Sequence, residues 1–340
     1  MHYHWGRLRR NRHLFPLGRG SILPFSDDFD RANGPLGGLW TGGTWTIAGN
    51  EAINTPTVGG ELLANGNMET ATPPGTWVPW IGNWNGAADE RTGGAGIQSG
   101  EVERAVAGGI QNYAYQALGG LTIGQWLYIS GWQKNVTNGD WNTTIYLGQA
   151  NLAAVSAFVM HTTSTWTMTP LAGRVLNATM WVALHKKATV DGRAGRFDDV
   201  SCKPLTLASL FASVEADVAD VVATVELDTV AATTPAGVVL NLDSVAAPAN
   251  FAIGYHDGTN CNLDKCVAGT YTSVISAAAA YAAGANIRVV KSGTSYSLYY
   301  NGVQIGATQT ISDAGIINNT RHGIFSTHSG NELDNFSLTK

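Results

Sequence analysis

The chain has 340 residues, enough for two domains of ordinary size, and 44% of them are hydrophobic, so a sizeable core can be buried. Only 13% are charged and 41 are glycine, a composition that suits many short strands joined by tight turns and excludes a helical bundle. The formal net charge of −5 is unevenly distributed, because the first 20 residues contain five arginines and no acidic residue.

Residues 1–25 form a basic segment with interleaved aromatic side chains that ends in several Gly and Pro residues. A disordered tail is one interpretation. Purely solvating tails are poor in aromatic residues, so we favour an arm that becomes ordered on a partner surface. Nucleic acid is not the expected partner, because the acidic remainder of the chain repels a polyanion. The residues expected to dock are Tyr3, Trp5, Arg7, Arg9, Arg10, Arg12 and Phe15.

Residues 26–58 contain too few predicted strands to bury a core alone. The alternation of Trp45 and Ile47 in GTWTIAGNEAI predicts a strand with one buried face. The pair Gly59-Gly60 then interrupts the pattern and is typical of a linker. This first part of the chain therefore needs strands from elsewhere to complete a sheet.

Residues 59–205 alternate β-like segments with clusters of turn residues, a pattern typical of a β-sandwich. Residues 206–340 repeat this pattern, and Asn301-Gly302 between two such segments predicts a tight hairpin. The alanine-rich run 275–286 could form a short helix on propensity alone. Its neighbours are strands at hairpin spacing, so we predict a strand followed by a loop.

The three cysteines, Cys202, Cys261 and Cys266, are an odd number, which argues against a disulfide framework. If Cys261 and Cys266 share one strand, their spacing places them on opposite faces, roughly 16 Å apart and too far to bridge. We therefore predict free thiols that are buried or half-buried.

Two family resemblances are visible, and they interlock. The segment DDFDRANGPLGGLW and its continuation to residue 53 resemble the opening of concanavalin A-like (laminin-G or lectin-type) jelly rolls. The C-terminal half, with AGVVLNLD, FAIGYHDG and LDNFSL, resembles the remainder of that domain, which is incomplete without both ends. Between them, NGNMET at 65–70 and RFDDVSC at 196–202 resemble the first and last strands of a galactose-binding-like carbohydrate-binding jelly roll.

These resemblances imply an all-β protein of two β-sandwich jelly rolls, one inserted in the other, with an extended N-terminal arm. The expected bounds are 1–25 for the arm, 26–58 and 206–340 for the discontinuous lectin-type domain, and 59–205 for the inserted module. The joints near Gly59-Gly60 and Pro204 should then lie close together, as insertion into a surface loop requires.

The resemblance also implies a structural calcium ion near the first and last strands of the inserted module. Calcium prefers several hard oxygen ligands, usually including backbone carbonyls. The matching positions are Glu69 together with Asp198 or Asp199. The alternative is a set of solvated or hydrogen-bonded carboxylates.

Sugar binding needs exposed aromatic platforms surrounded by polar groups. Within 59–205, Trp126, Trp132 and Trp181 lie in apolar segments and are predicted to pack in the core, as are Trp40 and Trp45 in the lectin-type domain. Other tryptophans lie in Gly-, Pro- and Asn-rich segments, where we expect exposure, with polar neighbours that could supply hydrogen bonds. This candidate glycan-binding set is Trp77, Trp80, Trp84, Trp141, Asn83, Asn85 and Asp89.

Catalysis has little support in the sequence. The segment YHDGTNCNLD, with His256, Asp257, Asn260 and Asp264, is better explained as an ordinary hairpin turn than as a ligand site. The carboxylate pairs Glu101/Glu103 and Glu215/Asp217 do not sit in the context of retaining glycosidases. No GxSxG, HExxH or phosphate loop is present, so we expect no enzyme.

The basic start is not followed by an apolar stretch, so we expect no signal peptide, and no run of 18 apolar residues predicts a membrane span. Together with the resemblances, this favours a phage virion structural protein, a head-decoration, fibre or tail-associated component made in the host cytoplasm. Its arm would dock on capsid or tail proteins, and its jelly rolls would attach to host surface polysaccharide. We also expect self-association. The alternatives are a purely structural subunit without sugar binding and, third, a glycoside hydrolase.

Overall fold

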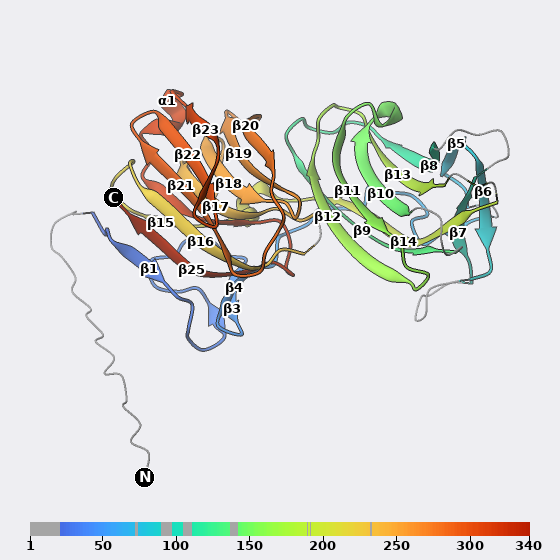
Figure 1. Ribbon diagram of the computed structural model, residues 1–340, viewed down its shortest axis with the longest axis horizontal. Coiled ribbons are helices and arrows are strands. Elements are labelled where there is room, and N and C mark those ends of the chain that lie inside the picture. Colours follow the sequence, from blue (N-terminus) through green and yellow to red (C-terminus); the bar gives the residue numbers. More distant parts are fainter. Residues whose placement is uncertain are drawn as a thin grey trace, which may run out of the picture.

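The computed structural model describes residues 21–340 except 72–73, 90–96, 105–110, 137–141, 189, 191 and 232. The described part is all-β, as predicted, with three short helical turns: Ala150–Leu152, Leu207–Leu210 and α1 (Ala314–Ile317). Its strands form two bodies that lie side by side (Figure 1). Residues 1–20, which contain all the arm residues expected to dock, lie outside the described residues.

One body, here called the split sandwich, contains strands from both ends of the chain. Its larger sheet has the order β2-β3-β4-β25-β16-β21-β22-β23, and β1 also pairs with β25. The last strand of the chain thus holds the first strands in place, with Phe25 opposite Leu338 and Ala52 opposite Leu333. The strands are β1 (Phe25–Asp27), β2 (Gly34–Pro35), β3 (Trp45–Ala48), β4 (Glu51–Asn54), β16 (Val222–Thr229), β21 (Ala285–Ser292), β22 (Ser295–Tyr300), β23 (Val303–Thr310) and β25 (Glu332–Thr339).

The second sheet of the split sandwich has the order β15-β24-β17-β18-β19-β20. Alternate residues of β17 face opposite sides, so Val238 joins the core between the two sheets while Val239 faces the other body. Trp45 is buried in the core between the two sheets, and the half-buried Trp40 packs against the same core. The prediction for both residues is confirmed. The strands are β15 (Phe211–Glu215), β17 (Ala236–Leu242), β18 (Phe251–His256), β19 (Asn260–Val267), β20 (Thr270–Ala278) and β24 (Arg321–Ser326).

The other body, here called the middle sandwich, has two five-stranded sheets, β11-β10-β13-β8-β5 and β12-β9-β14-β7-β6. Its own core includes Leu127, Ile145, Leu184 and Phe197, all fully buried. The strands are β5 (Val78–Ile81), β6 (Asn83–Ala87), β7 (Ser99–Glu103), β8 (Gln111–Leu118), β9 (Trp126–Asn135), β10 (Thr143–Gln149), β11 (Val155–His161), β12 (Thr167–Arg174), β13 (Met180–Lys187) and β14 (Ala194–Pro204).

The chain enters and leaves the middle sandwich at adjacent points. The N–H of Gly59 donates to the carbonyl of Pro204 at 2.8 Å, and Val58 forms an antiparallel bridge with Leu205. Beside this joint, Trp126 and Ala172 of the middle sandwich pack against apolar side chains of the split sandwich, among them Phe325. The outward face of β17 and β18 is covered in this way, which explains why both strands are buried along their whole length.

Several local predictions are confirmed. Asn301 and Gly302 have φ of 45° and 80° and form the turn between β22 and β23, with Tyr300 opposite Val303. β20 ends at Ala278 and β21 begins at Ala285, so the alanine-rich run is a strand followed by a loop. All three cysteines are free and buried, and Cys261 and Cys266 point into different cores from opposite faces of β19.

Candidate functional site

One face of the sheet β11-β10-β13-β8-β5 carries a group of aromatic side chains. On β8, Tyr113 and Tyr115 point outward while the alternating Ala114 and Leu118 enter the core of the middle sandwich. The same alternation on β13 directs Trp181 to this face. We call this group the aromatic face; it consists of Trp80, Tyr113, Tyr115, Tyr146, Phe158, Trp181 and His185.

The rings of the aromatic face support one another. Tyr115 stacks on Trp181 with ring centroids 3.7 Å apart and planes within 13°, and Trp80 lies nearly parallel to Tyr113 at 6.2 Å. Tyr113 and Trp181 are buried by their neighbours, whereas 46% of Trp80 is exposed. Burial raises the pKa of Tyr113 to about 12, so its hydroxyl is protonated at neutral pH. Trp80 therefore presents an exposed indole on a rigid aromatic support.

The predicted set of exposed tryptophans is partly wrong. Trp80 is exposed as predicted, and Trp141 lies outside the described residues. Trp77 and Trp84, in contrast, are buried in the core with ring centroids 6.2 Å apart. Each indole N–H donates to a backbone carbonyl, and a Cβ at Gly100 would lie 2.0 Å from the ring of Trp84. The Gly-rich sequence that predicted loops makes room for buried rings here.

The polar residues predicted to accompany these tryptophans lie elsewhere. Asn83 and Asn85 belong to β6, in the sheet that does not carry the aromatic face. Asp89 forms ion pairs with Lys134 and Arg196. Burial alone would raise the pKa of Asp89, but the hydrogen bonds from these two cations outweigh it and lower the pKa. The structure therefore does not bring the predicted glycan set together at one place.

The tryptophans predicted to pack in the core behave differently from one another. Trp126 and Trp181 are buried, but Trp132 is only half-buried. Trp126 packs at the junction of the two sandwiches and Trp181 within the aromatic face, so neither lies between the two sheets of the middle sandwich. The sequence of β13 predicted burial correctly, but it did not show which layer buries the ring.

The carboxylates proposed for calcium have structural partners. Glu69 accepts hydrogen bonds from the N–H groups of Ile97 and Gln98 at 3.0 and 3.1 Å. The buried Asp198 accepts one from the N–H of Asp199, beside an irregularity in β14. Among the residues that the structure describes, no three His, Cys, Asp or Glu side chains are placed to hold a metal. Calcium binding stays a prediction, which thermal unfolding with added Ca²⁺ and with chelator checks.

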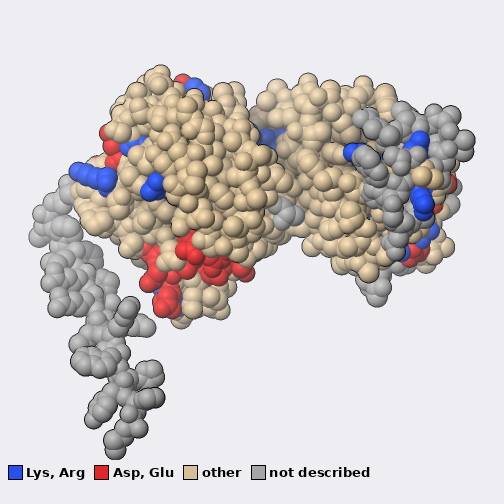
Figure 2. Space-filling model, viewed as in Figure 1, with Lys and Arg blue, Asp and Glu red and all other residues tan. Residues whose placement is uncertain are grey.

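A group of carboxylates gathers at one end of the split sandwich, the red area at the lower left of Figure 2. These carboxylates lie on or beside strands β1, β4, β16 and β25. Partial burial, and then repulsion from Glu332, Asp228 and Asp334, raise the pKa of Glu51 to about 7. The patch is therefore strongly acidic and favours cationic surroundings.

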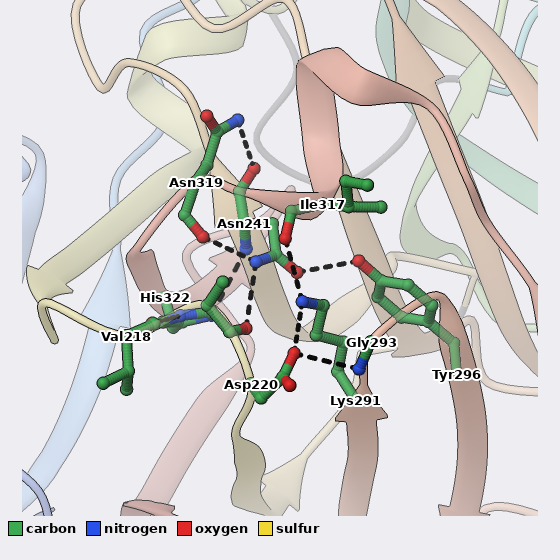
Figure 3. A network of polar contacts seen from close by, with 10 residues as sticks. Val218, Asp220, Asn241, Lys291, Gly293, Tyr296, Ile317, Asn319 and His322 are labelled. Atoms are coloured by element: carbon green, nitrogen blue, oxygen red, sulfur yellow. Dashed lines mark hydrogen bonds and ion pairs between the residues drawn. The ribbon is translucent and has the colours of Figure 1, made fainter.

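A cavity of about 760 Å³ opens beside the loop 217–221 and the β21–β22 turn. The polar groups behind it form a connected network (Figure 3). The buried Lys291 donates to Asp220 at 2.5 Å and to the carbonyl of Ile317 at 2.9 Å, and the hydroxyl of Tyr296 donates to Asn241 at 2.8 Å. The imidazole of His322 accepts from the N–H of Asn241. These groups hold the loops to one another, so the network is explained as a structural clamp.

One carboxylate of each pair considered for catalysis forms an ion pair. Glu101 of β7 forms an ion pair with Arg196 at 2.7 Å, and Glu215 at the end of β15 lies 3.3 Å from Arg321.

Within the described ranges, no helix is long and apolar enough to cross a membrane.

Comparisons with known proteins assign no family to the chain. No protein-family model and no curated protein matches it. The GH43 BlXynB protein from Bacillus licheniformis is 20% identical over 38% of this chain, with a TM-score of 0.30, and the match spans 28% of the BlXynB chain. A CBM4 structure is 15% identical over 42% of this chain and 98% of its own length, with a TM-score of 0.30. The tail fiber protein gp63.1 from an E. coli phage is 8% identical over 72% of this chain and 36% of its own, with a TM-score of 0.23.

Proposed function

We propose that the protein is a non-enzymatic glycan-binding component of a phage particle, and that the aromatic face of the middle sandwich contacts the sugar. The observation that carries this proposal is the exposed indole of Trp80, which lies parallel to Tyr113 and packs edge-on against the stacked pair of Tyr115 and Trp181. A pyranose ring presents an apolar C–H face that packs on an indole. A platform built on adjacent strands is rigid, so little conformational entropy is lost when sugar binds.

In this proposal the two sandwiches have separate roles. Residues 59–205 act as the glycan-binding module, and the split sandwich, with the basic arm preceding it, connects that module to other virion proteins. The arrangement of the joint supports this division, because the chain enters and leaves the middle sandwich at Gly59 and Pro204. The exposed Trp80 belongs to β5, at the opposite edge of its sheet from β11, the strand that borders the split sandwich (Figure 1).

The test compares the unmodified protein with Trp80→Ala in binding to polysaccharides from candidate bacterial hosts. Loss of one aromatic platform should weaken binding about tenfold, ~1.4 kcal/mol, since ring stacking contributes on the order of 1 kcal/mol. Isothermal titration calorimetry measures the affinity. Met168→Ala is the matched control, because Met168 is 45% exposed but lies on β12 of the opposite sheet.

Three results would contradict the proposal. If no host polysaccharide binds, the aromatic face is better explained as a contact with another protein, the purely structural alternative. If Trp80→Ala and Met168→Ala bind equally well, the sugar site lies elsewhere. If the protein releases reducing sugars from the polysaccharide, the hydrolase alternative replaces the non-enzymatic one.

A further inference from the structure

A second cavity lies at the junction of the two sandwiches. It has a volume of about 280 Å³. One wall comes from β11 and β12 of the middle sandwich and includes Ser156 and Arg174. The other comes from β18, β19 and β20 of the split sandwich and includes Asn262 and Ser276. Neither sandwich forms this cavity alone.

The wall of the split sandwich presents a fixed set of amide and carboxylate groups. Asp257 accepts hydrogen bonds from the N–H groups of Thr259 and Asn260 at 2.9 and 2.7 Å, which hold its carboxylate in the β18–β19 turn. The side-chain amide of Asn262 donates to the other oxygen of Asp257 at 3.0 Å. Asn262 is only 5% exposed, so its orientation is determined before any ligand arrives.

The wall of the middle sandwich presents a cation that is already neutralised. Arg174 forms an ion pair with Asp264 at 2.9 Å, and its guanidinium lies 4.8 Å from the ring centroid of Tyr271. The hydroxyl of Tyr255 also donates to Asp264 at 2.7 Å. A guanidinium has five N–H donors, so this single ion pair leaves donors for a ligand. Asp264 is fully buried, so this ion pair fixes the position of the Arg174 guanidinium.

These groups select for a neutral polar ligand. Arg174 and Asp264 cancel in charge, and Asp257 leaves the cavity with one negative charge, so an anion is disfavoured. Amides, a guanidinium, a carboxylate and serine hydroxyls together offer both donors and acceptors, which matches vicinal hydroxyls that need both. The volume lies just below the usual range for small-molecule sites, which suits a ligand no larger than one sugar ring.

We propose that this junction cavity binds a single neutral monosaccharide unit, so that the protein has a second glycan site besides the aromatic face. The inference extends the proposed function, but it stands on different residues, and either site can fail without the other. Since both walls are required, the site exists only while the two sandwiches are docked.

The test is ligand-observed saturation-transfer NMR on the full chain with a panel of neutral hexoses, pentoses and N-acetylhexosamines. Ser276→Phe should block the cavity, because Ser276 is exposed on β20 and the larger ring enters the space without removing a core contact. Ser295→Phe is the matched control, an exposed serine at the start of β22 that does not line the cavity. Circular dichroism verifies that both variants fold.

The expected result is that at least one monosaccharide gives a transfer signal with the unmodified protein, with Ser295→Phe and with Trp80→Ala, and that Ser276→Phe reduces this signal at least fivefold. Absence of signal from every sugar in the panel would overturn the inference, as would equal signals from Ser276→Phe and Ser295→Phe. A signal that disappears in Trp80→Ala but persists in Ser276→Phe would assign monosaccharide binding to the aromatic face and reject the junction site. Polysaccharide binding lost in Trp80→Ala with no monosaccharide signal would support the proposed function alone.

Discussion

His322 is the buried imidazole of the network in Figure 3, and it makes the fold sensitive to acid. Desolvation disfavours the charged ring and, with the nearby Lys291, lowers the pKa of His322 to about 4, although the carbonyl of Val218 opposes the shift. In the unfolded chain the pKa of an imidazole is about 6.5. Because the folded-state pKa is depressed, its stabilising contribution is complete above that unfolded pKa and is lost as the pH falls toward 4.

We therefore expect the free energy of unfolding to fall by about 2 kcal/mol between pH 7 and pH 5 from this residue alone. Urea unfolding at both pH values measures the change. His322→Gln serves as the comparison, because an amide does not titrate, while other histidines contribute equally to both proteins. Equal pH dependence in the two proteins would show that folding does not lower the pKa of His322.

The position of a single side chain could be predicted from the sequence where it depends only on the residues next to it in the chain. The spacing of Tyr113 and Tyr115 in QNYAYQAL indicates one face of a strand, and it could have pointed to the aromatic face. The partners Trp80 and Trp181 were not predictable, because their contact with these tyrosines depends on the pairing of β5 and β13 with β8. Composition likewise could not separate the exposed Trp80 from the buried Trp84.

At the scale of an element, the hairpin between β22 and β23 depends on the conformation of Gly302. Its φ is 80°, and a Cβ added there would meet no atom within 4 Å. Gly302→Ala should therefore cost only the strain of a left-handed backbone, about 1 kcal/mol in the free energy of unfolding. Thermal and urea unfolding measure this cost.

Gly119→Ala is the control for the hairpin variant, since a Cβ there also meets open space and the backbone lacks a positive φ. It should change stability by less than about 0.5 kcal/mol. A similar effect of the two substitutions would mean that the turn tolerates alanine and that its Asn-Gly sequence does not select the hairpin. The hairpin was predictable because the chemistry of the turn is contained in two residues. The complete burial of β17 was not, because its outer face is covered by residues distant in sequence.

At the scale of the whole molecule, the sequence indicated where the chain passes from one sandwich to the other, at Gly59-Gly60 and near Pro204. It could not show that the junction itself is a packed interface. The ring centroids of Trp126 and Phe325 lie 5.7 Å apart there, and the indole N–H of Trp126 donates a hydrogen bond of 3.1 Å to the hydroxyl of Tyr271 across the junction. Such contacts depend on how two finished sandwiches meet, and no local pattern encodes that arrangement.

The middle sandwich should fold by itself as residues 59–205, because every buried residue of its core, among them Leu127, Ile145 and Phe197, lies within this range. In the fragment, however, Trp126 loses its partners and becomes exposed. Trp126→Ala should therefore cost about 3–5 kcal/mol in the full chain, the usual effect of emptying a large buried site, and less than about 1 kcal/mol in the fragment. Urea unfolding followed by circular dichroism measures both. A fragment that stays unfolded would show that the middle sandwich needs its neighbour, and an equal cost in fragment and full chain would place Trp126 in the core of the middle sandwich instead of the junction.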